Sequence, residues 1–190
     1  MFIEKINFKA NVQQMLSDLE GVLLNTKWPE QKIVDNDRVY HANQLGLTYR
    51  TGATQPWYDA SGSLYDSNLK HFTGTESDFN QWNDIGNYTK DTILGLGDAI
   101  GMKFGRVRYM RLLPKTGLSV HADFEPRYHF ALSTNQYAYF GLSEPDGETD
   151  AKCYHIPQDG FFYKVNTLRN HFVFNGGWEP RIHLVMCEAK

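Results

Sequence analysis

The second half of this 190-residue chain is a series of short runs rich in β-branched and aromatic residues, separated by Pro, Gly and Asp. Runs of this length and spacing predict an all-β sandwich or barrel, and about eight of them match the strand count of a jelly roll. We therefore expect a mainly β fold with flanking helices, of the α+β class. The runs cover residues 106–113, 118–123, 127–132, 136–142, 152–156, 160–165, 171–174 and 181–187.

The first half of the chain has a different pattern. Apolar residues recur at helical spacing over residues 10–24, which predicts an amphipathic helix. Residues 25–74 show no sustained period and are read as loops and short strands. The segment Thr75–Asp78 resembles a helix-capping box, and Thr89 precedes a second predicted helix over residues 90–101.

The length of the chain suits one well-packed domain and is short for two. We expect a single domain over residues 1–190, in which residues 1–104 form a helical and loop part that packs on a barrel. Residues 105–190 would supply most of the jelly-roll core.

Composition argues against several classes of partner. The net charge of -3 gives no general attraction for phosphate backbones, so a nucleic-acid partner is disfavoured. No run of about 18 apolar residues occurs, and the first ten residues alternate charged and apolar side chains, unlike a signal peptide. Cys153 and Cys187 are too few for a disulfide scaffold and are expected to be reduced and semi-buried. These observations predict a soluble, cytoplasmic protein with no membrane partner.

Four polar residues in the last third of the chain suggest a metal site. They are His121, Asp123, His171 and Arg181. Two imidazoles and one carboxylate are the ligand set of the facial triad, which holds Fe(II) and leaves the other positions open. A nearby arginine could bind a carboxylate. The motif His-X-Asp is weak evidence by itself, because a hydrogen-bonded histidine beside a solvated aspartate gives the same pattern.

Two predicted strands carry one apolar and one cationic face. Side chains alternate along a strand, so Arg127 and His129 share one face of the run at 127–132. Arg181 and His183 share one face of the run at 181–187 in the same way. If these faces point outward, they are ordinary solvated surface. If they point inward, their burial requires a metal or an anionic ligand as compensation. Periodicity does not decide between the two.

Four short segments in a fixed order resemble one known family. They are Pro114–His121, Arg127–His129, His171–Asn175 and Pro180–Arg181. Together they are similar to the aspartyl/asparaginyl β-hydroxylase family of Fe(II)- and 2-oxoglutarate-dependent dioxygenases. The resemblance extends from Tyr109 to Met186, and the first half of the chain carries none of it.

This resemblance implies a double-stranded β-helix, cupin-like, with a metal inside one open end. It implies that His121, Asp123 and His171 are the catalytic iron ligands and that Arg181 binds the distal carboxylate of 2-oxoglutarate. Arg127 and His129 would lie near the carboxylate that sits on the metal. Some family members keep only the two histidines, whereas similar amino-acid hydroxylases also keep the aspartate.

The expected function is hydroxylation of an amino acid, free or within a peptide or protein. The cofactors would be Fe(II), 2-oxoglutarate and O₂, with succinate and CO₂ as co-products. One alternative is a non-catalytic jelly-roll module that binds an anionic ligand or sugar. Another is a metal-dependent cupin isomerase, or a dioxygenase without a cosubstrate.

Several further residues have ordinary structural interpretations. His41 and His155 are read as loop or strand-edge histidines, because neither lies in a matching motif. His183 could line the pocket or support a neighbouring group. The aromatic cluster at 49–66 is read as packing or as a substrate lid, and Ser143–Gly147 is read as a turn.

Overall fold

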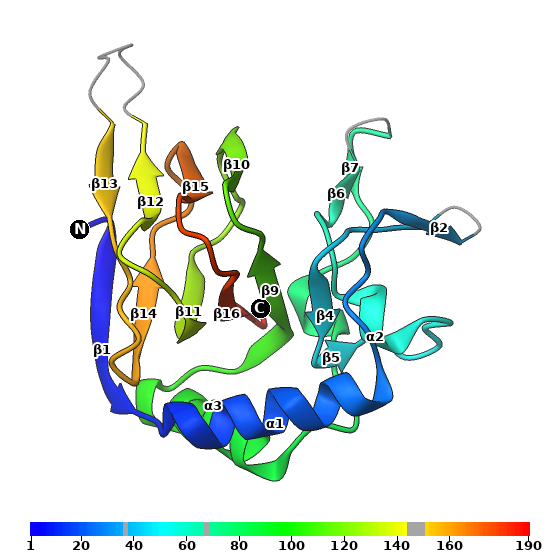
Figure 1. Cartoon of the computed structure of the whole chain (residues 1–190). Coiled ribbons are helices and arrows are strands. Elements are labelled where there is room, and N and C mark those ends of the chain that lie inside the picture. Colours follow the sequence, from blue (N-terminus) through cyan, green and yellow to red (C-terminus); the bar gives the residue numbers. More distant parts are fainter. Residues whose placement is uncertain (36–37, 67–68, 144–150) are drawn as a thin grey trace. The chain divides into compact units, whose positions relative to one another are not determined.

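The computed structural model describes residues 1–35, 38–66, 69–143 and 151–190 (Figure 1). The chain divides into two compact units. The first comprises Met1–Val12 and Arg111–Val185, and the second comprises Gln13–Met110 and Met186–Lys190. The expectation that residues 1–104 pack on the barrel as part of one domain stays a prediction.

The first unit contains two antiparallel sheets. One has the order β1 (Ile3–Lys9), β14 (Phe161–Val165), β11 (Arg127–Ser133) and β16 (Arg181–Glu188). The other has the order β10 (Thr116–His121), β15 (His171–Asn175), β12 (Ala138–Leu142) and β13 (Lys152–Tyr154).

Apart from β12 and β13, successive strands alternate between these two sheets along the chain. β10 lies in the second sheet, β11 in the first, β12 and β13 in the second, β14 in the first, β15 in the second and β16 in the first. This winding is that of a double-stranded β-helix, a jelly roll in which each turn contributes a strand to both sheets. The predicted fold class is therefore confirmed. Each of the eight predicted runs overlaps one strand, from β9 (Phe104–Leu112) to β16.

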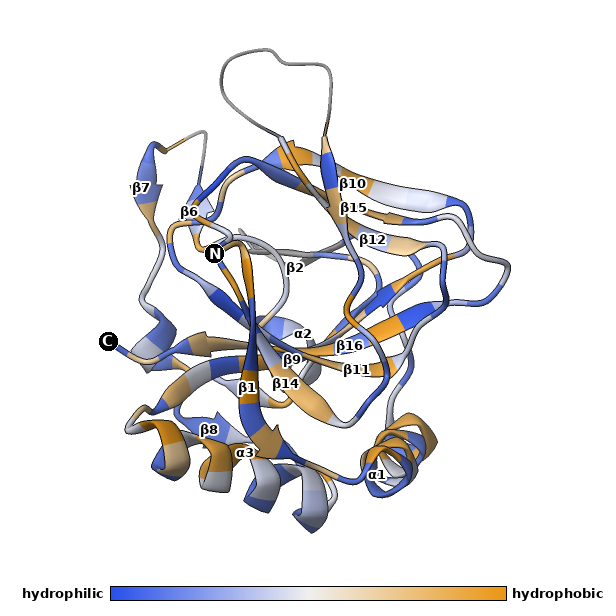
Figure 2. Ribbon diagram, turned by 90° about the vertical axis from the view of Figure 1, so that its left-hand side faces the viewer, coloured by the Kyte–Doolittle hydropathy of each residue, from blue (hydrophilic) through white to orange (hydrophobic). Residues whose placement is uncertain are grey.

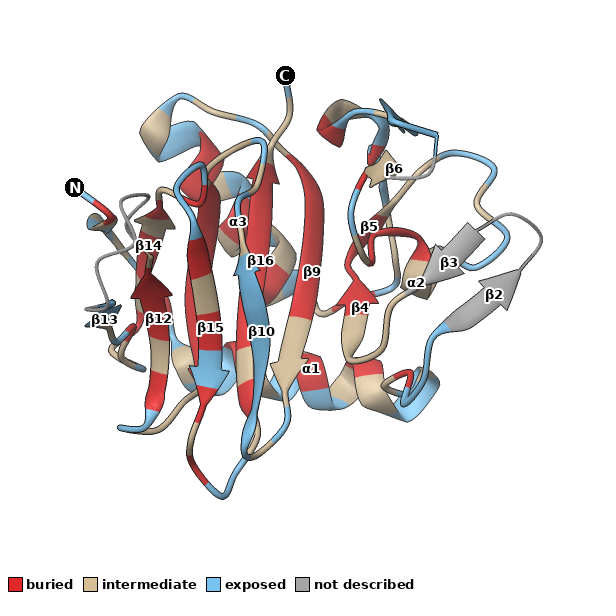
Figure 3. Cartoon of the chain, turned by 90° about the horizontal axis from the view of Figure 1, so that it is seen from above, coloured by how far each residue is buried: buried red, intermediate tan, exposed pale blue. Residues whose placement is uncertain are grey.

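The core of the first unit forms where inward-facing apolar residues from both sheets meet. Hydrophobic and hydrophilic residues are interspersed along the strands, as expected when each strand has one buried face (Figure 2). β11 is buried along nearly its whole length. β10 is exposed up to its last residue (Figure 3). The cluster comprises Phe2, Ala131, Phe140, Leu142, Ile156, Tyr163, Val165 and Val173.

β1 was not predicted, although the alternating sequence of residues 3–9 is typical of a strand. Ile3 pairs with Val165 and Ile6 with Phe162, so β1 extends the first sheet beyond β14. The alternation was interpreted only as evidence against a signal peptide. Its partner strand lies far along the chain, where local pattern gives no information.

The second unit contains the two long helices. α1 (Val12–Asn25) confirms the predicted helix and buries Met15, Leu19 and Val22. α3 (Asn87–Ile100) begins before the predicted start, because Gly86 and not Thr89 occupies the N-cap position. The Thr89 backbone N–H donates to the Asp18 carboxylate of α1 at 2.7 Å. This cap comes from another helix, so no local sequence signal could reveal it. α3 ends at Gly101, whose φ of 67° lies in the left-handed region.

Short strands and turns complete the second unit. β4 (Gln44–Gly46) pairs with β9, and the remaining strands form two-stranded ribbons. These are β2 (Ile33–Asp35) with β3 (Arg38–Tyr40), β5 (Thr48–Tyr49) with β8 (Gln81–Trp82), and β6 (Tyr65–Asp66) with β7 (His71–Phe72). α2 spans Pro56–Asp59.

The predicted capping box opens only a single 3-10 turn, Glu76–Asp78. The Asp78 carboxylate accepts the Thr75 N–H at 2.7 Å, as that motif requires. Glu76 forms a buried bidentate ion pair with Arg106, with N···O distances of 2.8 and 2.9 Å.

The cysteine prediction needs correction in part. Neither cysteine forms a disulfide, as expected, but neither is semi-buried: Cys153 is exposed on β13 and Cys187 is fully buried in β16. In the described part of the chain, no helix is long and apolar enough to cross a membrane. The predicted turn at 143–147 lies, apart from Ser143, outside the described residues.

Candidate metal centre

The cationic faces of β11 and β16 point inward. Arg127, His129, Arg181 and His183 are 7%, 5%, 6% and 1% exposed. This resolves the question that periodicity left open. The arrangement is the costly one, in which buried cations and imidazoles require compensation by a metal, an anion or one another.

Three of the predicted site residues converge at one end of the first unit. His121 is the last residue of β10 and pairs with His171, the first residue of β15, so both side chains leave the sheet on the same side. Their ring centroids are 4.4 Å apart. One possible ligand atom from each of His121, Asp123 and His171 lies within 4.8 Å of the others.

Strand pairing explains how residues so distant in sequence meet. β10 and β15 are neighbours in the second sheet, and Asp123 follows β10 directly. The backbone N–H of Asp123 donates to the Thr167 carbonyl at 2.7 Å, which fixes the segment after β10 beside the segment before β15. The triad is thus positioned by backbone hydrogen bonds on both sides.

Backbone carbonyls fix the same tautomer in His121 and His171, with the ring proton on Nδ1. Nδ1 of His121 lies 2.7 Å from the Ser119 carbonyl, and Nδ1 of His171 lies 2.9 Å from the Arg169 carbonyl. A carbonyl only accepts, so each Nδ1 must carry a proton. Each Nε2 then has a lone pair available for a metal. This pattern, with the second ring nitrogen bonded to backbone, is typical of metal-binding histidines.

Arg127 contacts the carboxylate of the triad. Its Nε lies 3.3 Å from Oδ2 of Asp123. The resemblance implied that Arg127 lies near a carboxylate on the metal, and the carboxylate it contacts in this structure is Asp123 itself. An arginine in this position limits the rotation of the aspartate side chain.

Arg181 lies deeper in the first unit, beside the ring of Phe140. Its Cζ is 5.0 Å from the ring centroid, and its Nη2 is 2.9 Å from Nδ1 of His183. Among the described residues, no carboxylate lies within ion-pair distance of Arg181. A buried guanidinium without a counter-charge is unusual and favours an anionic ligand.

Phe140 connects the two halves of the site. The centroid of its ring is 5.0 Å from that of His129 and 6.5 Å from that of His171. Together with the contact to Arg181, this places one aromatic wall beside both the triad and the guanidinium. Sequence reasoning missed Phe140, because nothing in the run Ala138–Leu142 distinguishes it from a core residue.

Burial sets the protonation of the site. It is the main reason that the pKa of His171 is lowered from 6.5, which favours the neutral imidazole that metals bind. Burial lowers the pKa of Arg181 to about 9, so the guanidinium still carries its charge at neutral pH. Burial first, and Arg181 second, hold the pKa of His183 well below 6.5.

Two other histidines behave as expected from their lack of a motif. Nδ1 of His155 lies 2.9 Å from the Ala138 carbonyl, a strand-edge contact. His41, in the second unit, donates its backbone N–H to the Ser61 hydroxyl. Neither belongs to the metal-binding group.

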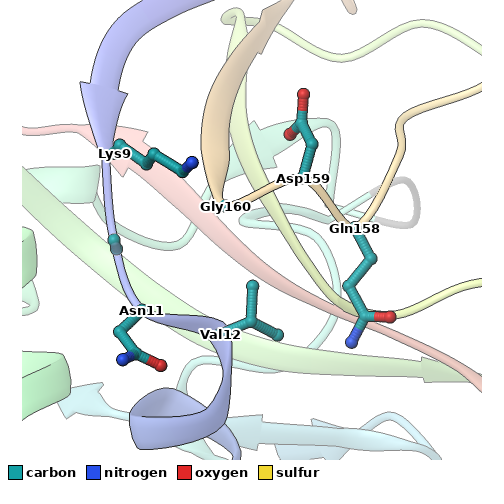
Figure 4. A pocket seen from close by; sticks show the side chains of 7 residues that line it. Lys9, Asn11, Val12, Gln158, Asp159 and Gly160 are labelled. Carbon is teal, nitrogen blue, oxygen red and sulfur yellow. The ribbon is translucent and has the colours of Figure 1, made fainter.

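An open surface hollow elsewhere on the first unit contains none of the site residues. It has a volume of about 520 Å³ and is lined by Lys9–Val12 and Gln158–Gly160 (Figure 4). Its carboxylate, Asp159, already accepts hydrogen bonds from Lys5 and Tyr163. The hollow therefore offers no comparable chemistry.

No protein-family model matches the sequence, and no curated protein matches it. Among solved structures, a 2OG-Fe(II) oxygenase family oxidoreductase from Burkholderia pseudomallei is 19% identical over 50% of this chain and 50% of its own, with a TM-score of 0.39. A cupin domain from Bordetella pertussis is 16% identical over 44% of this chain and 79% of its own, with a TM-score of 0.36.

Oxalate decarboxylase from Bacillus subtilis, studied for its Mn(II) centres, is 18% identical over 46% of this chain and 22% of its own, with a TM-score of 0.34. All three similarities are too low to carry an argument about function. The fold assignment rests on the strand order, and the site rests on its own contacts.

Proposed function

We propose that this protein is an Fe(II)- and 2-oxoglutarate-dependent dioxygenase that hydroxylates an amino acid, free or within a peptide or protein. The observation that carries the proposal is the convergence of His121, Asp123 and His171, whose possible ligand atoms lie within 4.8 Å of one another. A buried arginine without a carboxylate partner on the same inner surface supports it.

The donor set fits ferrous iron. Two neutral imidazoles and one carboxylate are the ligands of the facial triad, and the free Nε2 atoms described above meet this requirement. When bound, the metal would supply the redox chemistry that reduces O₂, converts 2-oxoglutarate to succinate and CO₂, and inserts one oxygen atom into a substrate C–H bond.

The protein's own residues would bind and orient the cosubstrate. Arg181 would hold the distal carboxylate of 2-oxoglutarate, for which its planar charged fork is well suited. Phe140 would exclude water between this carboxylate and the metal. Arg127 would hold the Asp123 carboxylate in a fixed orientation for binding the metal.

The amino-acid substrate class follows from the sequence resemblance to amino-acid hydroxylases. A search for products 16 Da heavier, among free amino acids and cellular peptides, would identify the class.

Turnover of labelled 2-oxoglutarate tests the proposal. We expect the protein with Fe(II) and ascorbate to release CO₂ slowly without substrate, because the cosubstrate half-reaction can proceed uncoupled. His171→Ala should lose this release through loss of a ligand. Arg181→Met should raise the 2-oxoglutarate concentration required for half-maximal CO₂ release by about a hundredfold or more, as expected when a hydrogen bond to a charged group is lost.

His155→Ala is the matched control, because it removes an imidazole from the same unit without touching the triad. It should turn over like the wild type. If iron-loaded protein neither releases CO₂ nor binds 2-oxoglutarate, the proposal is wrong. Anion binding without turnover would instead fit a non-catalytic jelly-roll module.

A further inference from the structure

His183 is a buried histidine to which the proposed function assigns no role. It lies on β16, two residues after Arg181, and is 1% exposed. Its Nδ1 is 2.9 Å from Nη2 of Arg181. Its ring centroid is 5.7 Å from that of His129, which is also buried.

The contact with Arg181 determines the tautomer of His183. A guanidinium has five N–H donors and no acceptor, so Nδ1 must be the acceptor and carries no proton. The imidazole is neutral in this environment, since burial and the charge of Arg181 both oppose its protonation. Its single ring proton must therefore be on Nε2.

The Nε2–H group of His183 is a donor with no acceptor in the described part of the chain. A buried donor without an acceptor is costly, and native proteins leave few such groups without a reason such as a ligand. The neighbouring polar groups, Arg181, His129 and His155, offer no carboxylate. Among the described residues, the Nε2–H of His183 therefore lacks a hydrogen-bond acceptor, which a carboxylate oxygen could supply.

We propose that His183 is a second binding residue for the carboxylate that Arg181 holds, to which it donates a hydrogen bond from Nε2. This inference rests on the proposed function for the identity of the ligand, the distal carboxylate of 2-oxoglutarate. Arg181 supplies the charge, and His183 supplies a donor at a fixed angle to it. The pair recognises a carboxylate group through two donors from one strand.

Two amide substitutions separate this role from mere support of Arg181. In His183→Asn, the amide oxygen takes the place of Nδ1 and can still accept from Arg181, but nothing replaces Nε2–H. In His183→Gln, the amide nitrogen reaches the place of Nε2 and retains the donor. If His183 only supports Arg181, His183→Asn should bind the ligand better than His183→Gln. If His183 binds the ligand itself, His183→Gln should bind it better.

The measurement is the dissociation constant for glutarate, a five-carbon dicarboxylate without the keto group, by calorimetry on the full metal-free chain. We expect His183→Asn to weaken binding about tenfold or more and His183→Gln to stay within about threefold, as for loss of one hydrogen bond to a charged group. His71→Asn, at an exposed histidine of the second unit, should change nothing. The reverse order of the two variants, or no glutarate binding by the wild type, overturns the inference.

Nitrogen-15 NMR of the wild type keeps the inference testable if a variant fails to fold. The proton of His183 should be on Nε2, and glutarate should shift its resonance. A proton on Nδ1, or no shift at saturating glutarate, contradicts the assignment.

The two proposals fail separately. CO₂ release with the reversed order of variants would sustain the dioxygenase and reject the role of His183. Glutarate binding with the expected order of variants, but no CO₂ release with iron, would sustain the role of His183 in carboxylate binding and reject the dioxygenase.

Discussion

Each ligand side chain at this site is held by a hydrogen bond to one of its polar atoms, which leaves another polar atom available to bind a metal. His121 and His171 each donate Nδ1–H to a carbonyl two residues earlier, which orients Nε2. Arg127 does the same for Asp123 by binding one carboxylate oxygen. A metal site formed in this way has less rotational freedom to lose when the ion binds.

Arg127→Met should therefore weaken metal binding without removing a ligand. We expect a loss of about 10- to 100-fold in affinity for Zn²⁺ or Fe²⁺, because the carboxylate loses the partner that orients it. A competitive chelator titration measures this. Lys152→Met, at an exposed residue of β13, is the control. Unchanged affinity in Arg127→Met would show that the contact with Asp123 has no role in metal binding.

His183 also predicts a pH dependence of stability. Its pKa in the folded chain is well below 6.5, so below pH 6.5 the unfolded chain binds a proton that the folded chain does not. Stability is then lost as the pH falls below about 6.5, by about 1.4 kcal/mol per pH unit, until the lowered pKa is reached. In His183→Asn, this contribution to the dependence of the unfolding free energy on pH should vanish. Urea unfolding of both proteins between pH 4.5 and about 7 tests the difference, and equal slopes would contradict it.

At the scale of elements, one asparagine joins the end of β15 to three other segments. Asn175 is 0% exposed, and its Nδ2 donates to the carbonyls of Leu112, Leu113 and Glu179 at 2.9–3.3 Å. Its Oδ1 accepts from Asn135 and from the Gly177 N–H. It does more than end a strand.

Asn175→Leu keeps the size of the side chain and removes every one of these bonds. We expect the free energy of unfolding to fall by about 3 kcal/mol, because buried carbonyls lose their donors. Asn25→Leu, at the exposed end of α1, should stay within about 0.5 kcal/mol of the wild type. Urea unfolding measures both, and a small effect at Asn175 would show that water replaces the lost donors.

The elements differ in how well their sequence predicts them. All eight jelly-roll strands could be predicted, because each is a short β-rich run between turn signals. β1 could not be placed, since its partner β14 is more than 150 residues away. The start of α3 depends on Asp18 of another helix. The triad residues could be named from motifs, but the inward direction of β11 and β16 required the structure, because both of their faces fit an exposed or a buried role.

At the scale of the whole molecule, the described chain consists of two compact units, and every residue of the proposed metal and carboxylate site belongs to the first. The jelly-roll winding brings the ends of β10 and β15 together and aims the inner faces of β11 and β16 toward the same core. One topology therefore explains both the convergence of the triad and the burial of Arg181.

The metal content of the purified chain tests the central claim most directly. After loading with Fe²⁺ without oxygen, and after desalting, elemental analysis should find about one ion per chain in the wild type, as a single facial triad requires. His171→Ala and Asp123→Ala should retain almost none, while circular dichroism shows the fold unchanged. A wild type that retains no metal, or variants that retain as much as the wild type, would contradict the account.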